Sequence, residues 1–206
     1  MIWEKWKQNF RKPGLWWGTR LALRMMNNHH RALQEFAAQY FMVPEDGVVL
    51  DIGCGGGFLI DFLLRRSPRA LVYGIDHSPL SVKQSLRYNR KAVKAGRVQV
   101  LEASVSAIPY RDHSFDLVTA CETIYFWPDL AHDFGEVWRV LRSGGLFVIC
   151  CDSCDPIACK KYTDTIEGMR VYTVEQLKGF LNESRFVEIT SHISRSGKVC
   201  LSARKP

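Results

Sequence analysis

A run of four apolar residues and one acid, followed by a cluster of glycines, most constrains how this chain folds. Residues 48–52 read Val-Val-Leu-Asp-Ile, and glycines follow at 53, 55, 56 and 57. Near-continuous apolar strands are typical of parallel sheets that helices cover on both faces. Glycine adopts positive φ and leaves room for a ligand, and a helix that follows presents its free N–H groups to the same place. The stretch therefore predicts a buried strand, a tight turn, and a helix from about Gly57, with a ligand at the turn.

Strands and helices continue to alternate after this turn. Further strands are expected at 70–76, 97–101, 114–121 and 146–151, with helices at 57–66, 78–95 and 133–141 between them. Thr173 and Gln176 form a predicted capping box that opens a last helix to about residue 182, and two closing strands follow at 186–191 and 198–202. Such alternation predicts an α/β fold with a mostly parallel sheet.

The glycine turn fits one nucleotide-binding pattern better than another. A dinucleotide fingerprint needs glycine at its sixth place, and counting from Gly53 that place is Phe58. The pattern present is Asp-x-Gly-x-Gly-x-Gly from Asp51, which resembles motif I of class I S-adenosylmethionine-dependent methyltransferases. Asp76 ends the next predicted strand, 19 residues after Gly57, where an acid can accept hydrogen bonds from ribose hydroxyls. A glycine turn that binds nothing is the alternative.

Two later segments extend this resemblance. Residues 103–110 are similar to the family's adenine-binding segment, with Ser104 in place of the usual acid, and residues 142–145 resemble the turn before its fifth strand. The resemblance covers about residues 45–206 and is nearest to the small-molecule, quinone-biosynthesis type. It implies a Rossmann-like three-layer sandwich with a seven-stranded, mostly parallel sheet and a terminal antiparallel hairpin. Residues 1–44 are then a helical extension, either a lid over the cofactor or a segment packed on the sheet.

The resemblance also implies S-adenosylmethionine as the cofactor and S-adenosylhomocysteine as the product. Ten residues then contact the cofactor, from its amino-acid end through ribose and adenine to the sulfonium: Asp51, Gly53, Cys54, Gly55, Asp76, His77, Ser78, Ser104, Val105 and Cys121. Asp51 is expected near the ammonium group.

The methyl acceptor is expected beyond the fourth strand. Glu122 and Tyr125 follow that strand and are the candidate catalytic or acceptor-binding residues. Phe126 and Trp127 are expected to pack in the core, with an aromatic face of the acceptor pocket as the alternative. His30 is a candidate general base for a hydroxyl or thiol acceptor, with a packed or surface histidine as the alternative.

The basic charge of the amino-terminal segment is compatible with more than one kind of binding partner. The chain has 206 residues and a net charge of +7, and residues 1–31 hold seven basic side chains and one acidic one. A solvated helix face or an anionic small substrate is favoured over RNA, because the motifs typical of base methylation are absent from the sequence. We therefore expect a small-molecule methyltransferase. The alternatives are a binding module for S-adenosylmethionine without turnover and an RNA methyltransferase that uses the basic arm.

Cysteines and apolar runs complete the expectations. The seven cysteines form no disulfide framework, and Cys151-x-x-Cys154 lacks a second ligand pair, so no metal is expected. No apolar run approaches the roughly 20 residues that a membrane span needs. The first residues are not followed by the apolar segment that a secretory signal contains. The expected location is the cytoplasm.

Overall fold

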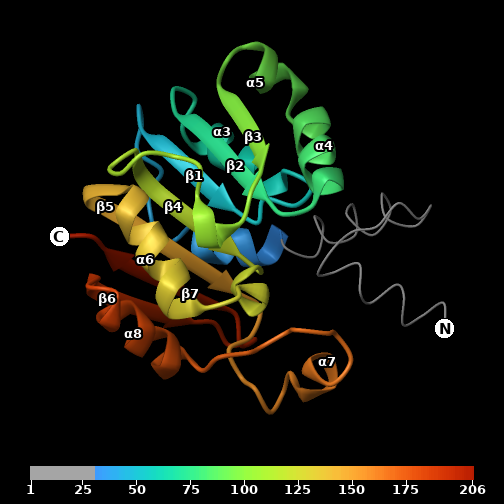
Figure 1. The fold of residues 1–206 in the computed structure, drawn as a ribbon, viewed down its shortest axis with the longest axis vertical. Coiled ribbons are helices and arrows are strands. Elements are labelled where there is room, and N and C mark those ends of the chain that lie inside the picture. Colours follow the sequence, from blue (N-terminus) through green and yellow to red (C-terminus); the bar gives the residue numbers. More distant parts are fainter. Residues whose placement is uncertain (1–30) are drawn as a thin grey trace.

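The computed structural model describes residues 31–206. Seven strands form one sheet in the order β3-β2-β1-β4-β5-β7-β6 (Figure 1). Their bounds are β1 (Val48–Ile52), β2 (Leu71–Asp76), β3 (Val98–Glu102), β4 (Phe115–Cys121), β5 (Leu141–Cys151), β6 (Val187–Ile193) and β7 (Val199–Arg204). The first five strands are parallel, and β7 runs antiparallel to both of its neighbours. This topology confirms the expected fold class.

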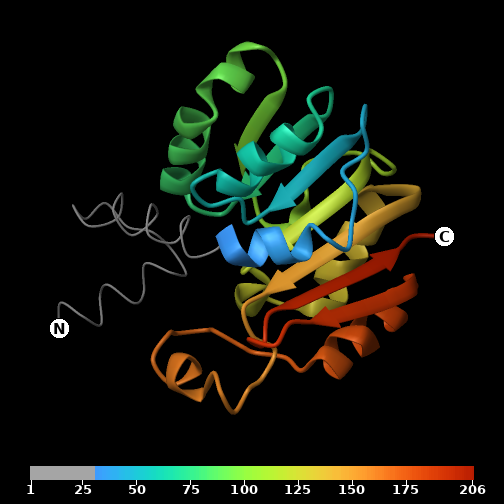
Figure 2. The ribbon, with the colours of Figure 1, turned by 180° about the vertical axis from the view of Figure 1, so that it is seen from behind.

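Helices cover both faces of the sheet. They are α3 (Phe58–Arg66), α4 (Pro79–Tyr88), α5 (Arg90–Lys94), α6 (Leu130–Val140), α7 (Lys160–Thr163) and α8 (Val174–Glu183), with short 3₁₀ turns η1 (Val105–Ala107) and η2 (Ile124–Phe126). One core cluster joins α3 to the helical residues 31–37, and a second joins α6 and α8 to the opposite face. Figure 2 shows the segment from residue 31 lying across the sheet on the side away from α6 and α8.

Alternation along each strand creates these two cores. Val49 of β1 packs in the α3 cluster, whereas its neighbour Leu50 packs in the α6 cluster, because successive side chains of a strand point to opposite faces. Both faces are therefore apolar, which is why the predicted strand reads as an almost continuous hydrophobic run.

The carboxyl ends of β1, β2 and β4 meet at one edge of the sheet. Ile52 pairs with Ile75 on one side and with Ala120 on the other. The chain order reverses between β1 and β4, which is the position where open α/β sheets bind ligands. The turn after each of these strands therefore opens onto a common site.

Asn89 divides the helix that the sequence predicts as continuous from 78 to 95. Its buried side chain donates hydrogen bonds to the carbonyl oxygens of Gly57 (2.9 Å) and Ser85 (3.1 Å). The chain accordingly ends α4 at Tyr88 and begins α5 at Arg90. The hydrogen bond from Asn89 to Gly57 connects the end of α4 to the residue before α3.

Three other bounds differ from the expectation. Helix α6 begins at Leu130 rather than at 133, because Asp129 caps it with hydrogen bonds to the N–H groups of Ala131 and His132. Strand β5 begins at Leu141, before the predicted turn at 142–145, and its pairing with β4 shifts register after Phe115. Between β5 and α8, where the sequence predicts no helix or strand, the chain forms the short helix α7.

The last helix begins as predicted. Thr173 accepts from the N–H of Gln176, and the Gln176 side chain accepts from the N–H of Thr173, which confirms the capping box. Within residues 31–206 no helix is both long and apolar enough to cross a membrane.

Candidate functional site

The three alternate glycines of the first turn all have positive φ, at 71° for Gly53, 51° for Gly55 and 81° for Gly57. A side chain on Gly53 would collide with Thr123, and one on Gly57 would collide with Ser85 and Asn89. A Cβ on Gly55 would meet nothing closer than 4.0 Å. Packing therefore requires glycine at 53 and 57, whereas Gly55 borders open space.

Asp76 connects the first two turns. Its Oδ2 accepts a hydrogen bond from the N–H of Gly55 and its Oδ1 accepts one from the N–H of Ser78, both at 2.9 Å. The side chain is buried, and burial raises its pKa against the opposing effect of these two bonds. The carboxylate is thereby held in place at the end of β2.

Asp51 is buried at the carboxyl end of β1 with one oxygen unused. Thr119 of β4 donates to its Oδ1 at 2.9 Å, whereas Oδ2 has no hydrogen-bond partner among the described residues. Burial raises the pKa of Asp51 to about 7. An unpartnered buried oxygen is costly, so Oδ2 marks a place for a donor or a cation.

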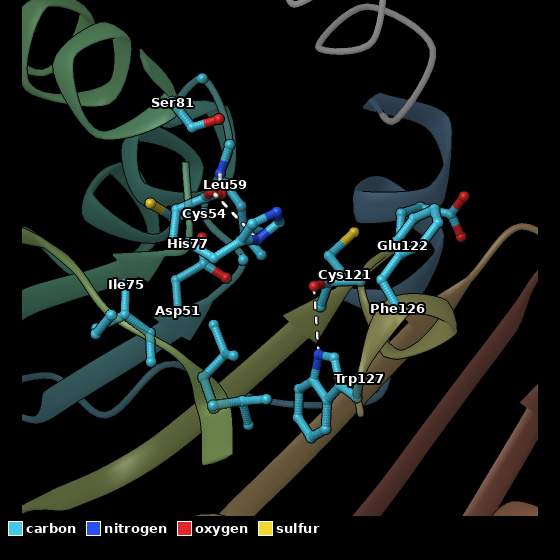
Figure 3. Close-up of a pocket in the computed structure, with 18 of the residues that line it drawn as sticks. Asp51, Cys54, Leu59, Ile75, His77, Ser81, Cys121, Glu122, Phe126 and Trp127 are labelled. Carbon is cyan, nitrogen blue, oxygen red and sulfur yellow. Dashed lines mark hydrogen bonds and ion pairs between the residues drawn. The ribbon is translucent and has the colours of Figure 1, made fainter. Parts of the chain in front are cut away.

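These groups line a cavity of about 320 Å³ at the edge where β1, β2 and β4 end. Figure 3 shows Asp51 and His77 on one side of it and Cys121, Glu122, Phe126 and Trp127 on the other. Nine of the ten predicted cofactor residues line the cavity: Asp51, Gly53, Cys54, Gly55, Asp76, His77, Ser104, Val105 and Cys121.

Ser78 is the exception among the ten. It is fully buried at the start of α4, where its side chain accepts from the N–H of Ser81, and it is not among the lining residues. Its own N–H binds Asp76, so Ser78 positions that carboxylate from behind instead of facing the cavity.

Glu122 lines the far end of the cavity and has a φ of 57°. Its Oε1 accepts from the N–H of Asp152 at 2.5 Å and from the hydroxyl of Tyr125 at 3.0 Å. Burial, together with the charge of Asp152, raises the pKa of Glu122 to about 7. The carboxyl group is thus oriented and poised to exchange a proton near neutral pH.

The prediction that Tyr125 faces the acceptor end of the cavity needs correction. Tyr125 is buried and does not line the cavity, because its hydroxyl donates to Glu122 and to the carbonyl oxygen of Ser153. Phe126 and Trp127 line the cavity at this end, and the expected core packing also holds, since Trp127 is buried in the core cluster that includes α6 and Phe126 packs against that cluster. Successive residues of a 3₁₀ turn point about 120° apart, so Tyr125 is directed toward Ser153, just after β5, while the next residue, Phe126, faces the cavity.

Gln34 lines the cavity and was not predicted. It is 4% exposed, and its Oε1 has no hydrogen-bond partner within the described residues. The apolar residues around it predict an amphipathic helix, but no sequence signal separates Gln34 from other polar residues of that helix. His30, the other candidate from this segment, lies outside the described residues.

The cavity is acidic. Asp51, Asp76 and Glu122 line it, and no described lysine or arginine does. S-adenosylmethionine, which the resemblance implies, carries a sulfonium and an ammonium group, and both cations fit such a site. The unpartnered Oδ2 of Asp51 and the open space at Gly55 agree with that cofactor. Across residues 31–206 no group of three or more His, Cys, Asp or Glu side chains is arranged to hold a metal ion.

Comparison with known proteins agrees with this geometry. Residues 50–149 match the family model described as a methyltransferase domain. The demethylmenaquinone methyltransferase of Thermus thermophilus is 36% identical over 102 residues, which are 49% of this chain and 45% of the relative. The 24-methylenesterol C-methyltransferase 2 of rice is 32% identical over 118 residues, which are 57% of this chain and 32% of the relative.

A solved structure matches nearly the whole chain. It is a methyltransferase from Haloferax volcanii in complex with the Trm112 methyltransferase activator, with a TM-score of 0.82, 18% identity, and coverage of 92% of this chain and 96% of that one. At this identity the likeness shows the fold. The chain spans only about a third of the length of the first curated relatives that it matches.

Proposed function

We propose that this chain, which belongs to the class I S-adenosylmethionine-dependent methyltransferases, transfers the cofactor's methyl group to an apolar small molecule that gives up a proton. The observation that carries the proposal is the pairing of Glu122 with an aromatic wall, Phe126 and Trp127, at one end of the acidic cavity. A carboxyl group that takes a proton and a flat apolar surface are together suited to a cyclic or unsaturated acceptor.

Residues at the ends of β1 and β2 would hold the cofactor. Asp51 would face the ammonium group, the backbone at Gly53–Gly55 would follow the methionine part, and Asp76 would accept from the ribose hydroxyls. Ser104 and Val105 would lie against adenine. When bound, the cofactor supplies a methyl group on a positively charged sulfur. The protein therefore has to bind, align and exclude water.

Glu122 would act as the base that accepts the acceptor's proton. Both of its hydrogen bonds go to Oε1, so Oε2 is the oxygen that would take the proton. A pKa of about 7 keeps a large fraction of this carboxyl ionised at neutral pH while making it a stronger base than an ordinary glutamate. Tyr125 would be a positioning residue, because it contacts Glu122 and does not face the cavity.

The relatives support an apolar acceptor. The names of the Thermus and rice proteins give them a demethylmenaquinone and a sterol as substrates, and both classes are largely hydrocarbon. Cys121 and the aromatic wall supply an apolar surface beside Glu122 in this chain. We infer a ring-bearing or polyunsaturated acceptor with an acidic C–H or O–H.

A turnover assay tests this proposal. The purified chain is incubated with S-adenosylmethionine and a panel of phenols, quinols, sterols and small RNAs, and S-adenosylhomocysteine is quantified by mass spectrometry. We expect release with an apolar small molecule, and a kcat that falls by about 100-fold or more in Glu122→Gln, since general base catalysis contributes about 10²–10⁴-fold. Asp155→Asn changes an exposed acid at the same end of the fold and is the matched control.

Three outcomes would contradict the proposal. Full kcat in Glu122→Gln would remove this residue as the base. Release with RNA alone would favour a nucleic-acid substrate and the basic amino-terminal segment. Tight cofactor binding without release on any member of the panel would favour a binding module.

A further inference from the structure

The segment that precedes the matched methyltransferase domain contributes an unpartnered acceptor to the cavity. Gln34 belongs to the helical residues 31–37, outside the matched residues 50–149. Its side chain is 4% exposed and lines the same cavity as Asp51. Gln34 Oε1 and Asp51 Oδ2 are both buried, and neither has a hydrogen-bond partner in the described part of the chain.

The backbone that carries Gln34 is fixed on the sheet. Leu33 and Ala37, which flank it, are almost completely buried in a cluster that includes Cys54 and Leu59 beside the glycine turn. Cys200 of β7 donates to the carbonyl oxygen of Ala37 at 3.8 Å. The Gln34 side chain is therefore held at the cavity by the packing of Leu33 and Ala37 in the same helix.

Two unpartnered buried oxygens in one acidic cavity call for a donor from a ligand. A buried acceptor without a partner is destabilising, and this cost is recovered when a ligand donates a hydrogen bond to it. At the amino-acid end of the cofactor the only donor is the α-ammonium group, whereas the α-carboxylate only accepts. An ammonium group has three N–H donors, enough to serve both oxygens.

We propose that Gln34 binds the α-ammonium group of the cofactor together with Asp51, so that the segment before the matched methyltransferase domain forms part of the cofactor site. The inference rests on the cofactor assignment of the proposed function. It makes Gln34 a recognition residue for the amino-acid end of the ligand, with no role at adenine or ribose. The affinity for nucleosides that lack the amino-acid end should therefore not depend on Gln34.

The test compares two ligands that differ by the amino-acid end. S-adenosylhomocysteine carries it and 5′-methylthioadenosine lacks it. Isothermal titration calorimetry gives both Kd values for the wild-type chain, for Gln34→Leu, and for Gln39→Leu as a control on an exposed glutamine of the same segment. We expect Gln34→Leu to raise the Kd for S-adenosylhomocysteine by about 10-fold or more, while the Kd for 5′-methylthioadenosine changes by less than about twofold.

Thermal melting separates recognition from a structural role. Leucine has nearly the volume of glutamine and removes the unpartnered oxygen, so the Tm of the free protein should rise or stay level in Gln34→Leu. The rise in Tm on adding S-adenosylhomocysteine should be smaller than in the wild type. Gln34→Glu keeps an oxygen at the same reach and should retain the preference for S-adenosylhomocysteine over 5′-methylthioadenosine.

The outcomes distinguish this inference from the cofactor assignment. Equal weakening of both ligands in Gln34→Leu, or no weakening of either, would overturn the role of Gln34 and leave the cofactor site in place. Failure of the wild-type chain to bind either ligand would overturn the cofactor assignment itself.

Discussion

The N–H of Gly55 donates to Oδ2 of Asp76 at 2.9 Å, which joins the turn after β1 to the acid that ends β2. The bond fixes the glycine turn and the carboxylate relative to each other before any ligand is present. We expect Asp76→Ala to weaken cofactor binding by about 1–3 kcal/mol, because it removes charge-assisted hydrogen bonds to ribose and releases the N–H groups of Gly55 and Ser78. Titration calorimetry with S-adenosylhomocysteine measures the change.

Asp164→Ala is the control for this change, because Asp164 is an exposed acid paired with Lys160 on α7. It should leave the Kd unchanged. Wild-type affinity in Asp76→Ala, with the fold intact by circular dichroism, would exclude Asp76 from the binding site.

The glycine turn gives a second prediction, in which two similar substitutions have opposite consequences. Gly53→Ala should unfold the turn, since its Cβ would collide with Thr123 at a φ of 71°. Gly55→Ala has room for its Cβ, so the free energy of unfolding of the free protein should fall by only about 1 kcal/mol because of the positive φ. The same Cβ should weaken cofactor binding, because it occupies space that the cofactor needs. Urea denaturation and calorimetry on both variants measure the two effects.

The comparison between the two variants is the check. If Gly55→Ala binds S-adenosylhomocysteine as well as the wild type does, the open space at residue 55 is not part of the ligand site. Equal loss of stability in the two variants would instead show that both glycines serve packing.

Local sequence patterns predicted most of the sheet and the backbone part of the site. A run of four apolar residues and one acid, with the glycines that follow, locates β1 and its turn because burial on two faces and positive φ leave few other residue types possible. Asp76 was predictable for a similar reason, since the parallel strands β1 and β2 end at the same edge.

The misplaced and missed residues depend on longer-range or finer geometry. Tyr125 and Phe126 are neighbours, and which of them faces the cavity depends on the phase of a single 3₁₀ turn. Gln34 reaches the cavity only because the helix that carries it packs across the sheet beside residues far along the chain, such as Cys200. Neither relationship leaves a periodic signal in the sequence.

Asn89 provides a third prediction, on stability. Its side chain is 4% exposed and donates to the carbonyl oxygens of Gly57 and Ser85. Asn89→Ala leaves the buried oxygen of Gly57 without that donor, so we expect the free energy of unfolding to fall by about 1–3 kcal/mol. Urea denaturation measures it, and Asn182→Ala, at an exposed asparagine of α8, is the matched control. A loss equal in both variants would contradict the role of Asn89 as the link between α3 and α4.

The buried carboxyl of Asp51 predicts how stability depends on pH. The pKa of Asp51 is about 7 in the folded chain and 3.8 as an ordinary aspartate, because burial disfavours its charged form. The unfolded chain therefore loses this proton near pH 4, whereas the folded chain keeps it to about pH 7. The stabilisation is complete below about pH 4 and is lost as the pH rises through about 7.

Asp51→Asn removes this dependence and measures its size. The free energy of unfolding of the unliganded wild type, relative to Asp51→Asn, should fall by about 2–4 kcal/mol between pH 4 and pH 7, at about 1.4 kcal/mol per unit of pKa shift. Urea titrations of both proteins across that range give the difference directly. A difference that does not change with pH would mean that Asp51 is ionised in the folded chain throughout.

The same carboxyl links cofactor binding to proton release. An ammonium group beside Asp51 favours its ionised form and lowers its pKa, so binding near pH 6 should release close to one proton from this residue. Calorimetry with S-adenosylhomocysteine in two buffers of different ionisation enthalpy counts the protons, and the affinity should increase as the pH rises toward about 7. Asp51→Asn should abolish the release, and 5′-methylthioadenosine, which lacks the ammonium group, should cause none in the wild type. Equal proton release by the two ligands would place the ammonium group away from Asp51, because only one of them carries the charge that ionises it.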